Sequence, residues 1–232
     1  MSAFGNKLPH VDDQGEQHDT RTMAQTQSVT VVRGNQELSE RAAHLFEATA
    51  VSFDCAAKDH ATWHNGRHHT LGPGVALRKL YRPSALLDPS LSQHLHTMVE
   101  RGAGVRISDE DISETIILDR RVAILAGDTS YGLRSYSIVT VPEVVHGVAS
   151  LFDATWRAAT EFAVYDRDLA ELRRLAPRIL DQLNTGATDE AAARVLGLSV
   201  RTYRRRVAEL MSALGAGSRF QAGARAQELG LI

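Results

Sequence analysis

Cysteine occurs once in the 232 residues, at Cys55, so the chain forms no internal disulfide and is not a disulfide-stapled scaffold. No apolar run approaches the roughly 18 to 20 residues that cross a bilayer. The N-terminus also lacks the basic-then-apolar order of a signal peptide. We therefore expect a cytoplasmic protein that has no membrane partner.

Lysine is scarce as well: only three of the 26 basic side chains are lysines, so arginine carries most of the positive charge. Residues 29–165 contain 13 basic and 16 acidic side chains, whereas residues 166–232 contain 11 basic and 8 acidic ones. Local charge, rather than the formal net charge of -2, is what attracts polyanions. The basic C-terminal end is therefore the part that favours an anionic partner.

The remaining composition is that of an ordinary globular protein, with 43% hydrophobic and 23% charged residues. The length suits two small domains, because single domains cluster near roughly 100 to 150 residues. Residues 1–28 have almost no apolar periodicity and are predicted to be a disordered leader. We expect an α/β domain over 29–163, a linker over 164–168 and an all-α domain over 169–232.

Helices and strands alternate in the predicted α/β domain. The apolar spacing predicts helices over 37–50, 88–101 and 142–159, and strands over 51–55, 75–81, 105–107, 115–118, 122–125 and 137–141. This order is typical of a layered domain, and the continuous apolar run at 116–118 predicts a sheet that is buried on both faces.

The C-terminal part shows helical spacing only. Helices are predicted over 169–183, 189–196, 200–214 and 218–229. Thr188, Ser199 and Ser218 stand where N-caps are expected, and Gly186, Gly197 and Gly215 fall at the helix boundaries.

The third of these helices carries two contrasting faces. One face is an apolar stripe formed by Tyr203, Val207, Leu210 and Leu214. The other face is basic and carries Arg201, Arg204, Arg205 and Arg206. A short helix, a tight turn and an arginine-rich helix are what insertion into the DNA major groove requires. Arginine also suits phosphate and guanine, because it offers paired donors.

This region resembles the LuxR-type (GerE-type) helix-turn-helix of bacterial transcription regulators. The matching positions are Leu180, Gly186, Ala193, Leu198, Ser199, Thr202, Leu210, Leu214, Gly215, Ser218 and Arg219. The resemblance implies DNA-binding residues of two kinds: phosphate contacts by Ser199, Arg201, Thr202 and Arg206, and base-edge contacts by Arg204, Arg205 and Ala208. It also implies a homodimer formed through the last helix, at Ala222, Gly223 and Ala226.

The stretch 112–128 reads as strand, turn at Asp119–Arg120 and strand, and it resembles the HxKxxxxD hairpin of the phospholipase D-like superfamily. Aligning Asp119 on the aspartate of that motif puts Ile112 at the histidine position and Glu114 at the lysine position. Isoleucine cannot attack phosphorus, and a carboxylate repels phosphate. We therefore expect the fold without the chemistry: no catalytic residue, no cofactor, and an effector or sensor domain as in actinobacterial regulators.

Two other interpretations remain open. A cluster at 54–69 could form a metallohydrolase site: Asp54, Cys55, Asp59, His60, His64, His68 and His69. No HExxH or CxxC pattern completes a ligand set, so a polar loop without metal is preferred. Alternatively, the acidic N-terminal domain is a pure protein-interaction module.

Taken together, these features predict a sequence-specific transcription regulator rather than an enzyme. We expect it to bind double-stranded DNA as a homodimer, while the N-terminal domain senses a small-molecule effector or a protein partner such as RNA polymerase.

Overall fold

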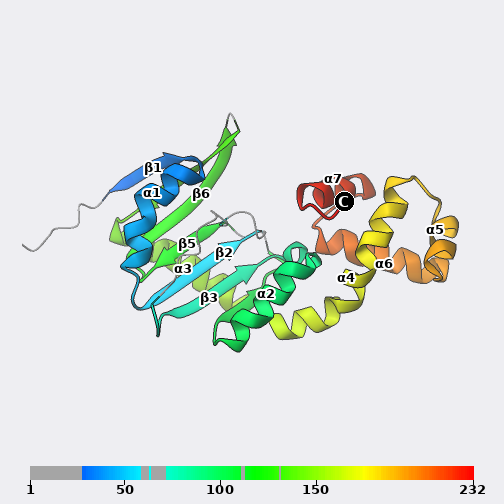
Figure 1. Ribbon diagram of the computed structural model, residues 1–232, viewed down its shortest axis with the longest axis horizontal. Coiled ribbons are helices and arrows are strands. Elements are labelled where there is room, and N and C mark those ends of the chain that lie inside the picture. The colour runs from blue at the N-terminus through cyan, green and yellow to red at the C-terminus, as the bar shows by residue number, and fades with distance from the viewer. Residues whose placement is uncertain (1–27, 59–62, 64–71, 111–112, 131) are drawn as a thin grey trace, which may run out of the picture.

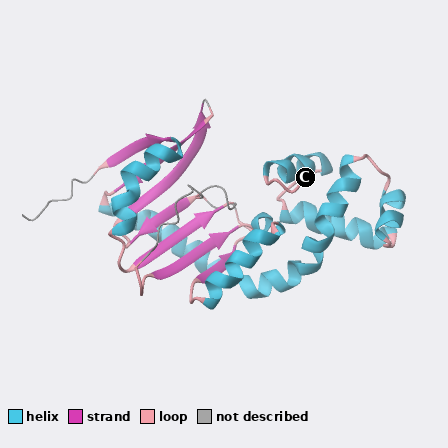
Figure 2. Cartoon of the chain, in the orientation of Figure 1, coloured by secondary structure: helices cyan, strands magenta, loops and turns pink. Residues whose placement is uncertain are grey.

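The computed structural model describes residues 28–58, 63, 72–110, 113–130 and 132–232. A sheet flanked by helices forms the N-terminal part, and helices alone form the C-terminal part (Figures 1 and 2). All of the predicted leader except Ser28 lies outside the described residues. No helix in the described part of the chain is long and apolar enough to cross a membrane.

Eight strands form one mixed sheet. They are β1 (Val29–Arg33), β2 (Ser52–Ala57), β3 (Ala76–Tyr81), β4 (Gly104–Ile107), β5 (Thr115–Leu118), β6 (Val122–Ser130), β7 (Leu133–Val139) and β8 (Thr160–Glu161). Their order is β1-β7-β6-β5-β2-β3-β4-β8. Only β2, β3 and β4 pair in parallel, and the other neighbours are antiparallel.

Helices cover both faces of the sheet, so the predicted α/β layering is confirmed. One face carries α1 (Gly34–Glu47), the 3-10 helix η1 (Pro83–Leu87) and α2 (Pro89–Glu100), and the other carries α3 (Pro142–Ala158) (Figure 1). Each face of the sheet has its own apolar core, and neighbouring residues of one strand point into different cores. Ile116 packs in the core on the α1 side, whereas Ile117 packs with Phe152 of α3 on the other side. This explains why the strand sequences are continuously apolar rather than alternating.

The predicted hairpin is present, formed by β5 and β6. Leu118 pairs with Val122, so residues 119–121 form the turn. Asp119 and Arg120 have φ values of 50° and 54°, and the backbone N–H of Arg121 donates to the carbonyl oxygen of Leu118 at 2.9 Å. The carboxylate of Asp119 accepts hydrogen bonds from the backbone N–H groups of Ala50, Val51 and Ser52, at 3.0, 2.8 and 2.9 Å. Asp119 thus fixes the start of the neighbouring strand β2.

The four C-terminal helices are α4 (Phe162–Asn184), α5 (Asp189–Leu196), α6 (Val200–Ala213) and α7 (Arg219–Glu228). Each predicted N-cap is confirmed, because Thr188, Ser199 and Ser218 accept hydrogen bonds from the backbone N–H of Ala191, Thr202 and Gln221. Gly197, with φ 70°, ends α5 in the left-handed conformation that favours glycine.

The predicted linker at 164–168 is wrong. These residues belong to α4, which begins on the sheet domain and continues into the helical domain. Phe162, Asp166 and Leu169 lie on its buried side, and the polar Asp166 is accommodated because Ser92 and Arg173 donate hydrogen bonds to it. The apolar cores of the two domains join in one cluster through η1 and α4. The domains are therefore connected by a packed helix, not by a loop.

The sequence-based predictions also missed β1, η1 and β8. They ended β6 at residue 125 instead of 130, and they placed β7 at 137–141 instead of 133–139. Strand β1 has only one buried residue, Val32, and β8 has two residues, so neither carries an apolar pattern of its own. They are strands because of their hydrogen-bonded pairing, β1 with β7 and β8 with β4.

Candidate nucleic-acid interface

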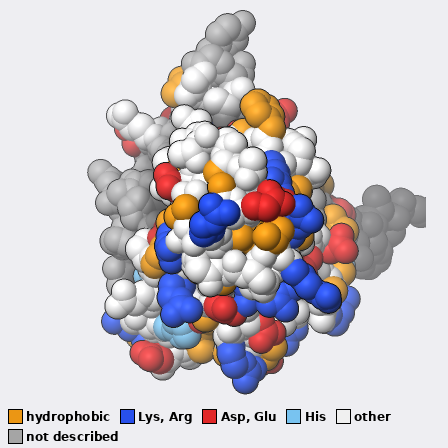
Figure 3. All heavy atoms as spheres, turned by 90° about the vertical axis from the view of Figure 1, so that its right-hand side faces the viewer, with side chains coloured by type: hydrophobic (Ala, Val, Ile, Leu, Met, Phe, Trp, Pro, Cys, Tyr) orange, Lys and Arg blue, Asp and Glu red, His pale blue; other side chains and the backbone are white. Residues whose placement is uncertain are grey.

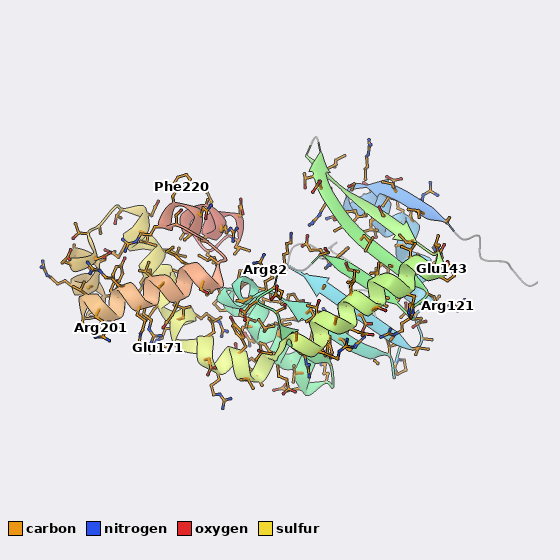
Figure 4. All side chains as sticks on the ribbon, turned by 180° about the vertical axis from the view of Figure 1, so that it is seen from behind. Arg82, Arg121, Glu143, Glu171, Arg201 and Phe220 are labelled. Carbon is orange, nitrogen blue, oxygen red and sulfur yellow. The ribbon has the colours of Figure 1, made fainter. Side chains whose placement is uncertain are left out.

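Helix α6 presents three arginines to solvent. Arg201, Arg204 and Arg205 are all exposed, and the side chains of the last two are 60% and 63% accessible. Arg201 lies at the end of the molecule far from the sheet (Figure 4). The view onto this end shows basic side chains interspersed with acidic ones rather than one uniform patch (Figure 3).

The start of α6 is held by two hydroxyl side chains. Ser199 Oγ accepts a hydrogen bond from the backbone N–H of Thr202 at 3.1 Å and lies 2.9 Å from Thr202 Oγ1. Both residues stand beside the positive end of the helix, where unpaired N–H groups favour an anion such as phosphate. Ala208 is exposed two turns further along. Its contact with a base stays a prediction.

The exposed arginines have acidic neighbours of the same chain. Arg204 Nε donates to Asp189 Oδ2 at 2.6 Å, and its Nη2 lies 3.6 Å from Glu190. Arg205 Nε lies 3.6 Å from Glu209, one turn along the same helix. At that distance the Arg205 pair is loose, whereas the Arg204 hydrogen bond is short and direct.

Arg206, for which the resemblance implied a phosphate contact, is mostly covered by its own chain, and its contact with DNA stays a prediction. Its side chain is only 12% exposed and is held by two carboxylates, Glu209 on α6 and Glu171 on α4 (Figure 4). These hydrogen bonds raise the pKa of the Arg206 guanidinium above its ordinary value. Arg206 therefore joins α6 to α4. Sequence patterns do not reveal this contact, because Glu171 precedes Arg206 by 35 residues.

Two of the three predicted dimer residues are also placed differently. Ala222 and Ala226 are 0% exposed within their own chain, in the core of the helical domain. They are small because α7 packs against its neighbours there, so neither can contact a second chain. Gly223 is half-buried and lines a groove of about 560 Å³ between the end of α4 and α7.

Sequence reasoning missed the most exposed large apolar side chain of this region. Phe220 is 87% exposed and lines the same groove (Figure 4). The sequence does contain a signal for this exposure. Phe220 lies in the first turn of α7, and the small residues Gly223 and Ala224 one turn later leave the helix surface beside its ring uncovered.

In the N-terminal domain, Glu114 is buried and paired with Arg134 of β7. The carboxylate at the motif's lysine position is thus neutralised by a neighbouring strand. The other motif position, Ile112, lies outside the described residues. Burial raises the pKa of the nearby Cys55 thiol to about 11, which keeps it protonated and unreactive at neutral pH.

Most of the predicted histidine cluster lies outside the described residues: Asp59, His60, His64, His68 and His69. Asp54, the other acidic member, is buried and accepts two hydrogen bonds of 2.7 Å from Arg78. Among the described residues no group of three or more potential metal ligands occurs.

No protein-family model matches the chain. Three solved structures share part of its arrangement. TrmBL2, an archaeal chromatin protein whose structure shows a novel mode of DNA binding, is 16% identical and is matched over 60% of this chain and 55% of its own, with a TM-score of 0.46. The phospholipase D family member Nuc from Salmonella typhimurium and NucT from Helicobacter pylori are each 8% identical over 58% of this chain and 98% of their own, with TM-scores of 0.43 and 0.42. At these scores the three likenesses add no conclusion about this chain.

A sequence relative is more informative. Over 168 residues the chain is 32% identical to the bialaphos biosynthetic pathway regulatory protein of Streptomyces hygroscopicus. The match covers 68% of the chain but 62% of that protein, so the chain spans less than two thirds of its relative's length. The chain is therefore similar, over most of its own length, to a protein named as a pathway regulator.

Proposed function

We propose that the protein is a sequence-specific DNA-binding transcription regulator, with a LuxR-type helix-turn-helix in the C-terminal domain and no enzymatic activity. The observation that carries this proposal is helix α6, which has a capped N-terminus and exposed Arg201, Arg204 and Arg205 and follows α5 after a left-handed glycine turn. An exposed arginine-rich second helix is the element that such domains insert into the major groove. The name of the 32% identical relative supports a regulatory role.

Fluorescence anisotropy with DNA fragments from upstream of the protein's own gene tests this function. We expect one fragment to bind tightly, and an Arg204→Ala, Arg205→Ala variant to lose at least tenfold in affinity for it. The matched control is Arg41→Ala, Arg157→Ala, which removes the same charge from exposed positions of the N-terminal domain. Weak binding to all fragments that added salt abolishes would be non-specific and would contradict the proposal.

The proposed regulator acts as a homodimer, and we assign the contact to the groove between α4 and α7. Phe220 of one chain offers an aromatic side chain. The groove beside it has an apolar part formed by Leu183, Gly223 and Ala224, and polar residues line the rest: Asn184, Arg219 and Gln227. A two-fold interface requires one patch to be complementary to itself, and a projecting ring beside a groove meets that requirement. Phe220→Asp should shift sedimentation from dimer to monomer, whereas Leu133→Asp, at an exposed site on β7, should not.

The proposed effector site is a groove of about 550 Å³ between α3 and the sheet. Ala56 and Leu80 form part of its floor, and Val148 and Phe152 line it from α3. Helix α3 leads through the two-residue strand β8 into α4. A ligand that displaces α3 would therefore act on the helix that enters the DNA-binding domain.

A thermal-shift screen of small molecules tests the sensor role. A ligand present at 100 times its dissociation constant adds about 2.7 kcal/mol to the free energy of unfolding. Val148→Phe, which places a larger side chain of α3 in the groove, should abolish the shift of any true ligand. If no molecule stabilises the protein, a pure interaction module that docks RNA polymerase or another protein becomes the better account of this domain.

A further inference from the structure

Asp189 occupies a position where three helices meet. It is the first residue of α5, and its two carboxylate oxygens are bound by different arginines: Oδ2 by Arg204 Nε of α6 at 2.6 Å, and Oδ1 by Arg219 Nη2 of α7 at 2.7 Å. The Asp189 side chain is 14% exposed, whereas the Arg204 side chain is 60% exposed. The carboxylate is thus covered while the guanidinium that it holds projects into solvent.

The geometry of this contact decides which donors remain. Arginine carries five N–H donors in a rigid plane, one on Nε and four on the two terminal nitrogens. Asp189 is bound only by Nε, so the two terminal nitrogens at the end of the side chain make no hydrogen bond to it. The contact of Nη2 with Glu190, at 3.6 Å, is longer than a hydrogen bond. Two parallel donors at that end match the O6 and N7 acceptors of guanine, which lie side by side in the major groove.

Arg205 is the useful contrast. It is as exposed as Arg204, but its nearest acidic partner is Glu209 at 3.6 Å, and no carboxylate of the described residues fixes it at hydrogen-bonding distance. A side chain that is not fixed loses rotamer freedom when it binds, whereas one already held in place loses less. A mobile guanidinium can follow a phosphate, and a fixed one discriminates between base edges.

We propose that Asp189 is a positioning residue that fixes Arg204 for recognition of guanine, whereas the loosely paired Arg205, for which the resemblance implied a base contact, makes contacts that tolerate any sequence. This inference rests on the proposed DNA-binding function. Asp189 itself has no free carboxylate oxygen for a base, because both accept hydrogen bonds from arginines. The hydrogen bonds from Arg204 and Arg219 lower the pKa of the Asp189 carboxyl, so the charge that holds Arg204 is present at neutral pH.

Selection from random-sequence DNA with the full chain tests the assignment. The wild type should select a guanine at one position of each half-site. Asp189→Asn should reduce the preference for that guanine by about tenfold, with the other positions unchanged. The double variant Asp189→Asn, Arg204→Ala should show no less preference than Arg204→Ala alone, because both changes remove the same contact.

Arg219→Ala is the matched control, since it removes the other partner of Asp189 but leaves Arg204 in place. It should keep the guanine preference even if it lowers the melting temperature. Asp189→Glu retains the charge and moves the carboxylate outward by one methylene, so it tests positioning if the asparagine variant does not fold. We expect it, too, to weaken the preference for guanine.

Three outcomes would overturn the inference. An equal loss at all positions with Asp189→Asn would make Asp189 a structural tie between helices. The same change of preference with Arg219→Ala would lead to the same conclusion. A wild-type protein that selects no sequence would remove the proposed function itself, and with it any role in reading bases.

Discussion

Arg78 of the sheet domain and Arg204 and Arg205 of the helical domain use the same side chain in opposite ways. In the sheet domain, Arg78 reaches from β3 to the buried Asp54 at 2.7 Å and to Asp153 of α3 at 3.0 Å, and it lies over the rings of Phe152 and Trp156. In the helical domain, Arg204 and Arg205 keep about 60% of their side chains in solvent. An arginine with partners on two layers holds those layers together, whereas an arginine on one exposed helix face is available to a ligand.

The helix α4 belongs to both arrangements. Near its start, Asp166 accepts hydrogen bonds from Ser92 and Arg173 and lies 2.9 Å from His96 Nε2, which attaches α4 to α2. Further along, Glu171 binds Arg206 of α6. One helix thus carries buried ion pairs toward the sheet and supports the arginine-rich helix on its other side.

The largest effect is expected from breaking the buried pair in the sheet domain. Arg78→Ala leaves the carboxylate of Asp54, which is 1% exposed, without its partner. We expect a loss of about 3 to 5 kcal/mol in the free energy of unfolding, measured by urea denaturation. Arg205→Ala should change it by no more than about 0.5 kcal/mol. Equal losses would break the contrast between structural and available arginines.

Acid should weaken the contacts that α3 and α4 make with the sheet domain. Burial alone would raise the pKa of Asp153 and Asp166, but hydrogen bonds from arginines and other donors outweigh it and lower both values. A carboxyl with a lowered folded-state pKa stabilises the protein above its unfolded value of about 3.9, and this contribution is lost as the pH falls through the folded value.

Urea titrations between pH 6 and pH 3 check this prediction. Both tryptophans, Trp63 and Trp156, precede the helical domain, so their fluorescence reports the sheet domain, whereas far-UV circular dichroism reports both. We expect the urea concentration at the fluorescence midpoint to decrease as the pH is lowered below about 4. Asp166→Asn should make this decrease smaller. A midpoint that does not change with pH would show that these carboxylates contribute little.

A smaller effect is expected at the start of α6. Ser199→Ala removes the side chain that caps the backbone N–H of Thr202 and should lower the free energy of unfolding by about 1 kcal/mol. Ser199→Asp, which can still accept that hydrogen bond, should retain the stability but add a charge that repels phosphate. Comparing the melting temperature with DNA affinity for the two variants separates capping from DNA contact.

The smallest effect, and the only gain, is expected at Tyr203. Its ring is fully buried, and its hydroxyl oxygen has no hydrogen-bond partner among the described residues. Tyr203→Phe removes the unsatisfied group and should raise the free energy of unfolding by up to about 1 kcal/mol, measured by chemical denaturation. A loss of stability would mean that a bound water satisfies the hydroxyl.

The accuracy of the sequence-based predictions follows the range of the interactions involved. The bounds of α5 were predicted as observed, and those of α6 and α7 within a residue of each end, because a cap such as Ser199 and a glycine such as Gly197 act within four residues. The linker failed, since nothing near Asp166 in the sequence reveals that Ser92 and Arg173 would satisfy its charge.

The candidate interface divides in the same way. The sequence alone determined that an arginine-rich helix follows a short helix and a glycine turn, because helix caps, turns and apolar spacing are local properties. Only the tertiary structure decided which arginine side chains are exposed to a ligand. Arg206 is covered and ion-paired with Glu171, Arg204 is held by Asp189, and Arg205 is loosely paired with Glu209. It also enclosed Ala222 and Ala226 and exposed Phe220. Burial and ion pairing depend on residues brought together from distant parts of the chain, so the helix could be predicted from its own residues but the roles of its side chains could not.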